Sequence, residues 1–187
     1  GWSGKLIACE ADAQDMAEIA RSANFQVKTL LTKEATRANV TEEISRAANV
    51  LELGDIFMIS YAGHGGQVQD LNGDEDDARD ETWCLYDGEL LDDEINTELA
   101  KFSEGVRILA ISDSCHSGTI VRDAYLAKFG VNYETESYRF MPADIALRVY
   151  RKNREFYEKI QQNPELKDAR DVKASVLLLS GCQDNQA

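Results

Sequence analysis

The fold is decided by the stretch IFMISYAGHGG at residues 56–66, where a short apolar run leads directly into a glycine-rich turn that contains a histidine. A nearly continuous apolar run of this length is typical of a strand buried on both faces of a parallel sheet. A second stretch of the same design, VRILAISDSCHSG at 106–118, also ends an apolar run in a polar segment. We therefore expect two buried strands whose carboxyl ends meet at one crevice, as in other open α/β sheets.

Helix and strand patterns alternate along the rest of the chain. Apolar residues at helical spacing predict helices over about 11–23, from 36–39 to about 53, over about 92–102 and over about 143–163. Asn39 and Glu42 resemble a capping pair for the second of these. Further strands are predicted at 25–31 and 176–179, and 61–91 is predicted as a long loop rich in Gly and Asp. This alternation indicates an α/β fold with a mostly parallel sheet flanked by helices.

Length and composition exclude several classes of protein. A chain of 187 residues with 43% hydrophobic residues suits one packed domain. Its net charge of −14 disfavours nucleic acid as a partner. No apolar run reaches the roughly 20 residues of a membrane-spanning helix, and no signal peptide is recognisable. The four cysteines form no CxxC pair, so we expect free thiols in a reducing, cytoplasmic compartment instead of disulfides or structural zinc.

The acidity is concentrated in residues 70–98, which hold 13 acidic residues and one base, Arg79. Such runs usually form a solvated acidic loop. The sharper interpretation is a cation site, because clustered carboxylates repel one another unless something neutralises them. The opening of an EF-hand loop at 70–74 keeps a calcium-binding protein without catalysis open as an alternative, although Glu75 stands where that loop needs glycine.

The two strand ends predict a cysteine nucleophile paired with a histidine. A thiol becomes strongly nucleophilic when a neighbouring imidazole takes its proton. Cys115 is the candidate nucleophile, and His64 is a better partner than His116, which points away from Cys115 if the backbone is extended there. The N–H groups of Gly65 and Cys115 would then form an oxyanion hole. A single Cys or His at the end of a strand usually has a structural role. Catalysis is favoured here because both residues occur together, at the ends of two adjacent strands and next to glycines.

These two motifs resemble those of a known family. YAGHGG at 61–66 and DSCHSG at 113–118 look like the His and Cys motifs of caspase-like cysteine peptidases, and more narrowly of metacaspases and their bacterial relatives. NGDE at 72–75, GCQDNQ at 181–186 and the Cys-x-x-Asp element at 9–12 are similar to further family elements. The resemblance implies one caspase-like catalytic domain over 1–187. It also implies an incomplete domain that lacks the family's first strand and C-terminal part.

The resemblance also implies roles for individual residues. Cys115 is the nucleophile and His64 its acid–base partner. Peptides or proteins are cleaved after Arg or Lys, through an acidic pocket formed by Asp113 and Asp12 and lined by Cys9. Ala62 stands where some relatives have a serine near this pocket. The alternative within the same family is a caspase-like pseudo-enzyme that acts as a binding module.

Calcium is a further implication of the resemblance, since many metacaspases need it. Asp80, Asp92 and Asp93 are the best-matched ligands, and Glu81 and Asp123 are weaker candidates.

Residues 119–172 match no family motif and are expected to be an insertion after the catalytic cysteine. Residues 119–173 hold 11 of the 20 bases of the chain. One interpretation is a helix packed on the sheet, with a buried stripe of Tyr150, Phe156, Tyr157 and Ile160. The other is a cover over the crevice, acting as an internal inhibitor or as a self-cleavage site between 122 and 140.

Overall fold

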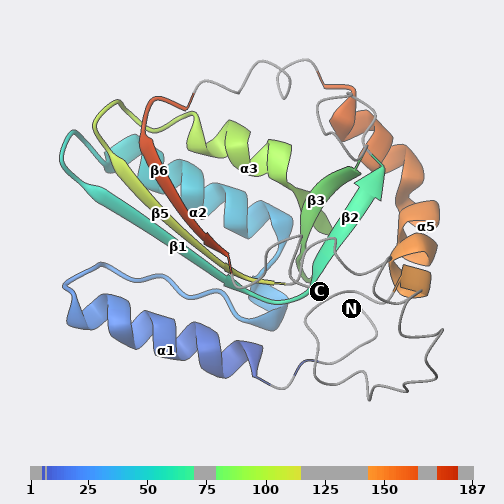
Figure 1. The fold of residues 1–187 in the computed structure, drawn as a ribbon, viewed down its shortest axis with the longest axis horizontal. Coiled ribbons are helices and arrows are strands. Elements are labelled where there is room, and N and C mark those ends of the chain that lie inside the picture. Colours follow the sequence, from blue (N-terminus) through green and yellow to red (C-terminus); the bar gives the residue numbers. More distant parts are fainter. Residues whose placement is uncertain (1–5, 7, 70–78, 115–142, 164–171, 181–187) are drawn as a thin grey trace.

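The computed structural model describes residues 6, 8–69, 79–114, 143–163 and 172–180, and its strands form two sheets (Figure 1). The first sheet is parallel, with strand order β1-β5-β6, and consists of β1 (Ile56–Ala62), β5 (Arg107–Asp113) and β6 (Ser175–Ser180). The second sheet is antiparallel, with strand order β2-β3-β4, and consists of β2 (Gly65–Gln69), β3 (Arg79–Cys84) and β4 (Glu89–Leu91). The predicted α/β class with a parallel sheet flanked by helices is confirmed.

The helices cover both faces of the parallel sheet. In chain order they are α1 (Cys9–Ser22), the short 3₁₀ helix η1 (Thr32–Glu34), α2 (Arg37–Val50), α3 (Asp92–Leu99) and α5 (Ala143–Gln161). Figure 1 shows α1 on one face and α2 with α3 on the other. None of the described helices is both long and apolar enough to cross a membrane.

The second helix starts at a different cap from the predicted one. Thr36 has an extended backbone, with φ −90° and ψ 157°, and its side chain accepts a hydrogen bond from the N–H of Asn39 at 3.2 Å. Thr36 is therefore the N-cap. The predicted capping pair of Asn39 and Glu42 is wrong, because Asn39 is already inside the helix as its third residue.

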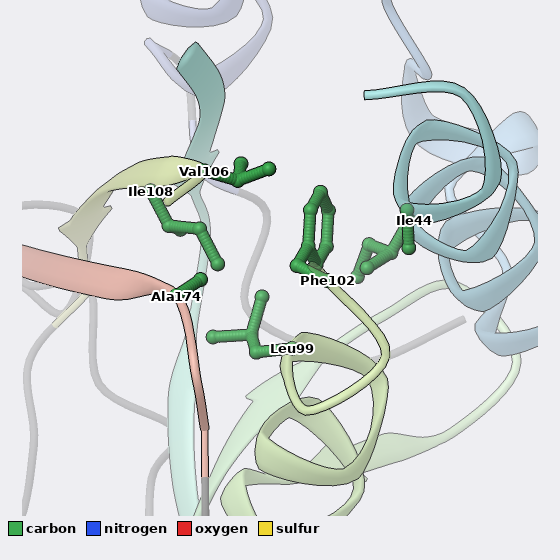
Figure 2. Packing of buried hydrophobic residues seen from close by; sticks show 7 residues of the cluster. Ile44, Leu99, Phe102, Val106, Ile108 and Ala174 are labelled. Carbon is green, nitrogen blue, oxygen red and sulfur yellow. The ribbon is translucent and has the colours of Figure 1, made fainter. Parts of the chain in front are cut away.

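The main core lies between the parallel sheet and the α2–α3 layer (Figure 2). Ile44 of α2 and Leu99 of α3 are buried there with Phe102 and Ile108. The Phe102 ring lies 4.8 Å from the ring of Phe57 in β1, centroid to centroid. This layer anchors the sheet from one side.

The opposite face of the sheet is much less covered, so the prediction of strands buried on both faces is wrong. Along β5 burial alternates, with Ile108 and Ala110 buried and Leu109 and Ile111 half-buried. The reason is that α1 is the only one of the described helices on that face, where it contacts β1. β6 is open on both faces, and residues 176–179 are 46–60% exposed.

Two glycine turns set the register of β1 and β5. The N–H of Gly54 donates to the carbonyl oxygen of Gly105 at 3.0 Å, which joins the turns that precede the two strands. Gly105 has φ +86°, and an added Cβ would lie 2.0 Å from a methyl carbon of Leu53, so glycine is required there. The strands start with Ile56 opposite Arg107 and therefore end together.

Two sequence predictions about strands are wrong. Residues 25–31, predicted as a strand, run between α1 and η1 without joining either sheet. Their apolar alternation fits a strand, but a strand also needs a neighbour for its N–H and C=O groups. Residues 61–91, predicted as a loop, contain the antiparallel sheet. There, Trp83, Leu90 and Leu91 are buried, and the surrounding acids hide this apolar content from the sequence pattern.

Helix α5 packs against β2 through an aromatic side chain. Tyr157 is 1% exposed and clusters with Val68 of β2, while Tyr150 and Ile160 pack beside it. Of the four residues predicted to form a buried stripe, Tyr150, Tyr157 and Ile160 do pack in this cluster. Phe156 is 48% exposed instead, and the Arg37 guanidinium lies 5.0 Å from its ring centroid.

Candidate active site

The strand register brings the ends of β1 and β5 side by side. The last pair of the ladder is Ala62 opposite Asp113, and the N–H of Gly63 donates to the carbonyl oxygen of Asp113 at 3.4 Å. His64 therefore follows β1 at the edge of the sheet where β5 leads toward Cys115. Cys115 lies outside the described residues, so the Cys–His pair stays a prediction.

His64 is held through its main chain. The residue is 9% exposed, and its carbonyl oxygen accepts hydrogen bonds from the N–H of Cys84 at 3.0 Å and from the Tyr61 hydroxyl at 2.8 Å. These donors come from β3 and β1, so His64 lies where the two sheets meet. Gly65, a predicted oxyanion-hole donor, is buried and starts β2 opposite Trp83. Its role stays a prediction.

The end of β5 is packed on one side and open on the other. Ser112 and Ser114 are buried, and their hydroxyl oxygens lie 2.9 Å apart. Asp113 lies between them in sequence and is exposed, because successive side chains of a strand point to opposite faces. The residue before Cys115 is therefore anchored in the core, while the preceding carboxylate faces the α1 side.

A pocket of about 510 Å³ lies on that side, between α1 and the ends of the parallel strands. Asp12 and Asp113, the two acids that the sequence assigns to a substrate pocket, both line it. Ser60 and Ala62 of β1 line the same pocket. The structure thus brings Asp12 and Asp113 to the same pocket. Their role in binding a substrate stays a prediction.

Sequence reasoning missed one acid of this pocket. Asp15 lines it as well. It follows Asp12 by three residues, a spacing that places two side chains on the same face of a helix, so this signal was available in the sequence. Cys9, which was expected to line the same region, begins α1 and is not among the lining residues of the described pocket.

The backbone brings the predicted calcium ligands to one end of the antiparallel sheet. The β3–β4 ladder ends with Thr82 opposite Leu91, so Asp80 of β3 and the residues that follow β4 lie toward the same end of the sheet. Asp92 begins α3, and its Oδ1 accepts a hydrogen bond from the N–H of Asp93 at 2.9 Å. Asp92 and Asp93 thus form the first turn of α3, and α3 contacts β3, the strand that contains Asp80.

Within the described residues, no group of three or more His, Cys, Asp or Glu side chains is arranged to hold a metal. Only the backbone of Asp80 is described, Glu81 is half-buried in β3, and Asp123 lies outside the described residues. The calcium ligands accordingly stay predictions.

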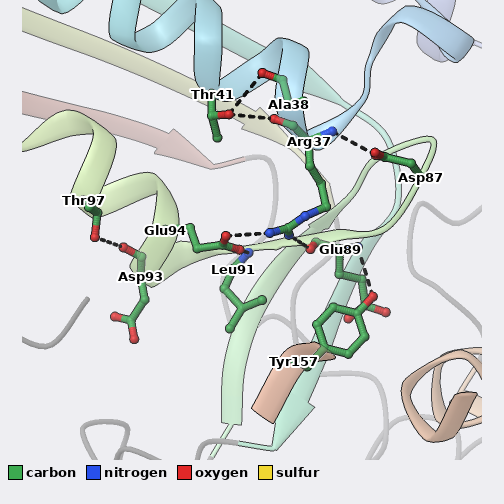
Figure 3. A network of polar contacts seen from close by, with 10 residues as sticks. All are labelled: Arg37, Ala38, Thr41, Asp87, Glu89, Leu91, Asp93, Glu94, Thr97 and Tyr157. Atoms are coloured by element: carbon green, nitrogen blue, oxygen red, sulfur yellow. Dashed lines mark hydrogen bonds and ion pairs between the residues drawn. The ribbon is translucent and has the colours of Figure 1, made fainter. Parts of the chain in front are cut away.

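Arg37 anchors the neighbouring acidic turn to the helical layer (Figure 3). Its guanidinium donates to the Glu89 carbonyl oxygen and to Glu94 Oε1, the latter at 2.5 Å. The backbone N–H of Arg37 donates to Asp87 Oδ1 at 2.8 Å. From α5, the Tyr157 hydroxyl accepts a hydrogen bond from the N–H of Glu89 at 3.2 Å. One arginine thus joins α2, β4 and α3 at the point where α5 docks.

Glu89 is an exception to the expectation of a solvated acidic segment. It is 1% exposed, and burial raises the pKa of its carboxyl group to about 7, against the smaller lowering effects of Thr82 and Arg37. Burial also raises the pKa of the neighbouring Cys84 thiol, and the Glu89 charge adds to this shift. The acidic segment therefore includes a carboxyl group inside the protein.

Comparisons with known proteins agree with the motifs. The family model described as metacaspase, peptidase C14 domain, matches residues 2–123. Metacaspase-1 of Candida glabrata is 32% identical over 180 residues, covering 82% of this chain and 46% of that protein. Metacaspase-1 of Schizosaccharomyces pombe is 30% identical over 174 residues, covering 81% of this chain and 41% of that protein.

A solved structure resembles the chain along its whole length. It is the crystal structure of a protein from Geobacter sulfurreducens, which is 60% identical and has a TM-score of 0.85. The match covers 100% of this chain and 68% of that one. The chain spans less than half the length of the two yeast relatives. The family model covers well over half of the chain, and the chain belongs to the metacaspase family of peptidase C14 domains.

Proposed function

We propose that this chain carries the catalytic machinery of a cysteine endopeptidase that cleaves after Arg or Lys. The observation that carries the proposal is that Asp12 and Asp113 line one pocket at the carboxyl end of β1, the strand that leads into His64. A guanidinium or ammonium group entering this pocket would meet carboxylates in charge-assisted contacts. The same carboxylates would repel an aspartate side chain, so the pocket favours basic residues at the cleavage site.

The chemistry follows from the Cys–His pair. The His64 imidazole takes the proton of the Cys115 thiol, and the thiolate attacks the carbonyl carbon of the scissile bond. His64 then gives the proton to the leaving amine, which departs and leaves a thioester. Water hydrolyses the thioester, releases the carboxylic acid and restores the thiol. The N–H groups of Gly65 and Cys115 would stabilise the oxyanion of each tetrahedral intermediate.

The test measures cleavage by the full-length protein of fluorogenic peptides that end in Arg, Lys or Asp. The expected result is cleavage of the Arg and Lys peptides, lost in Cys115→Ala. Fast and selective alkylation of Cys115 by iodoacetamide, with Cys9, Cys84 and Cys182 as internal references, would support an activated thiol. Preferred cleavage of the Asp peptide, or full activity in Cys115→Ala, would contradict the proposal. A folded protein with neither cleavage nor a fast thiol would be a binding module.

Calcium belongs to the same proposal as an activator. Carboxylate oxygens are the ligands that this ion prefers, and the contact of α3, which begins with Asp92 and Asp93, with β3, which contains Asp80, supports a shared site. When bound, the ion would neutralise the mutual repulsion of these carboxylates. The residues themselves would fix the start of β3 against the start of α3.

A reducing, cytoplasmic location is also proposed. The mechanism needs Cys115 as a thiol, and in the described part of the chain Cys84 is a free thiol. Both features favour a compartment in which disulfides are rare.

A further inference from the structure

We infer that Tyr61 is a positioning residue for His64, holding the main chain of the histidine in the orientation that its reaction with Cys115 requires. The inference rests on the proposed function, because it takes His64 as the acid–base partner of Cys115. Tyr61 opens the YAGHGG stretch, and none of the chemistry described so far uses its side chain.

The Tyr61 hydroxyl contacts the main chain of two segments, the turn after β1 and the end of β3. Its single O–H is shared as a bifurcated donor between the carbonyl oxygen of His64, at 2.8 Å, and that of Cys84, at 3.2 Å. The His64 carbonyl oxygen also accepts the N–H of Cys84 at 3.0 Å. Two donors from different strands thus converge on one carbonyl oxygen, and they fix the peptide plane that follows the His64 side chain.

The Tyr61 ring is itself held rigidly. It stacks on the indole of Trp83, with ring centroids 4.6 Å apart and an angle of 13° between the ring planes. Trp83 is 8% exposed and belongs to a buried cluster with Leu85 and Leu90. A hydroxyl on a ring fixed in this way has little freedom to move away from its acceptors. Burial raises the pKa of Tyr61 well above its usual value, so the group keeps its proton and remains a donor.

Gly63 shows how closely the ring approaches this turn. A Cβ added at position 63 would lie 2.4 Å from the Tyr61 hydroxyl oxygen and 2.6 Å from the ring carbon that carries it. Real side chains do not tolerate such contacts, so the tyrosine side chain fills the space that any side chain at position 63 would need. Tyr61 and Gly63 therefore work as a matched pair directly before His64.

The competing explanation is that Tyr61 serves only as a core aromatic residue. The stacking on Trp83 fits either role, but the hydroxyl distinguishes them. A purely structural ring has no need for a hydroxyl aimed at the His64 carbonyl, and phenylalanine would pack equally well. Positioning also has a kinetic consequence, since small misplacements of a reacting group cost much of the rate.

The experiment compares Tyr61→Phe with Tyr86→Phe in the full-length protein. Both remove one hydroxyl, and Tyr86 is an exposed residue between β3 and β4. We expect Tyr61→Phe to lower kcat for an Arg peptide about tenfold with KM unchanged, because the pocket is untouched. The pH profile of Cys115 alkylation should also move to higher pH, since a misplaced imidazole stabilises the thiolate less. Tyr86→Phe should match the wild type.

Gly63→Ala is the second variant, because its methyl group pushes against the Tyr61 hydroxyl, and it should move the alkylation profile in the same direction. The inference is overturned if both variants keep the wild-type kcat and alkylation profile while only their melting temperatures fall. Failure of the proposed function gives a different result, because the His64→Ala variant would then cleave the Arg peptide as fast as the wild type does. In that case NMR spectra test the positioning role directly. The imidazole signal that disappears in His64→Ala belongs to His64, and its chemical shift is compared between the wild type and Tyr61→Phe. An unmoved His64 signal in Tyr61→Phe overturns the positioning role.

Discussion

At the scale of single residues, the surroundings of each carboxylate decide what it can do. Asp12 and Asp113 line a pocket open to solvent and can meet a cation from outside. Glu89 is enclosed by Thr82, Cys84, Arg37 and Tyr157, and its charge has no access to water. A carboxyl group is therefore open to solvent at one site, whereas at the other its burial raises its pKa to about 7.

Replacement of the pocket acid on β5 should remove the preference for basic residues. We expect Asp113→Asn to lower kcat/KM for an Arg peptide roughly 10- to 100-fold, because a hydrogen bond to a charged group is worth about 1.5–3 kcal/mol. The fold should be unchanged, since the Asp113 side chain is exposed. Steady-state kinetics and a melting curve of the same preparation check both statements.

Matched variants on α1 sharpen that measurement. Asp15→Asn should have a smaller effect in the same direction, whereas Glu18→Gln, exposed on the same helix and outside the pocket lining, should have none. Undiminished cleavage of Arg peptides by Asp113→Asn would show that the pocket is assigned wrongly.

Glu89 should make stability depend on pH in the direction opposite to that of a paired surface acid. The pKa of its carboxyl group rises from the usual 4.5 to about 7, so the folded state binds its proton more tightly than the unfolded state does. The contribution of Glu89 to the free energy of unfolding is then fully present below pH 4.5 and is lost as the pH rises through 7. At about 1.4 kcal/mol per pKa unit, the loss is at most roughly 3 kcal/mol.

Glu89→Gln isolates this contribution. The variant should unfold with a similar free energy at pH 4.5 and with a higher one than wild type at pH 8, as measured by urea unfolding at both values. Parallel pH dependence of the two proteins would mean that Glu89 does not carry the effect.

At the scale of elements, Arg37 shows how a single side chain holds several of them together. It lies at the start of α2, contacts β4 and α3 through hydrogen bonds, and reaches the aromatic face of Phe156 on α5. Its side chain is 15% exposed, and that of its partner Glu94 is 17% exposed. Such a pair is largely desolvated, so loss of one partner leaves an uncompensated charge.

Arg37→Ala should therefore lower the free energy of unfolding by about 3 kcal/mol. The control is Arg46→Ala on the same helix, where an ion pair with Glu43 involves an arginine side chain that is 63% exposed. That change should stay within about 0.5 kcal/mol of wild type. Urea unfolding of the three proteins at one pH gives both numbers, and equal losses for the two variants would refute the anchoring role.

At the scale of the whole molecule, the two sheets meet at His64, and the described part of the acidic segment contains β3, β4 and most of α3. Residues 70–98 carry most of the net charge of −14, and folding brings several of these acids to the start of α3. A cation there would relieve repulsion in the folded state more than in the extended chain.

Calcium should consequently raise the melting temperature. Binding to the folded state alone stabilises it by about 2.7 kcal/mol at a hundredfold excess over Kd. Differential scanning fluorimetry with millimolar calcium tests this, with magnesium at the same concentration as the ionic control. The double variant Asp92→Asn and Asp93→Asn should lose the shift. A wild-type melting temperature indifferent to calcium would leave the acidic segment as a solvated loop.

The sequence by itself determined the α/β class, the two strands that end at the site and the family, because these depend on local periodicity and on short contiguous motifs. Residues 56–60 and 106–112 could be recognised as strands without knowledge of the fold, and the structure has strands at Ile56–Ala62 and Arg107–Asp113. Asp12 and Asp113 were also identifiable, through the resemblance of their motifs. The spacing of three residues between Asp12 and Asp15 also places both side chains on one face of a helix, as the pocket lining has them.

The tertiary structure alone decided the features that depend on neighbours far away in the chain. Residues 25–31 have the pattern of a strand but join no sheet, and the acidic stretch of 79–91 forms one because β2 and β4 pair with β3. The burial of Glu89 depends on Arg37 and Tyr157, which are 52 and 68 residues away in the sequence. The contact of Tyr61 with the main chain of His64 depends likewise on Trp83 and Cys84 from another sheet. Pairing and burial are properties of assembled elements, so a local pattern does not contain them.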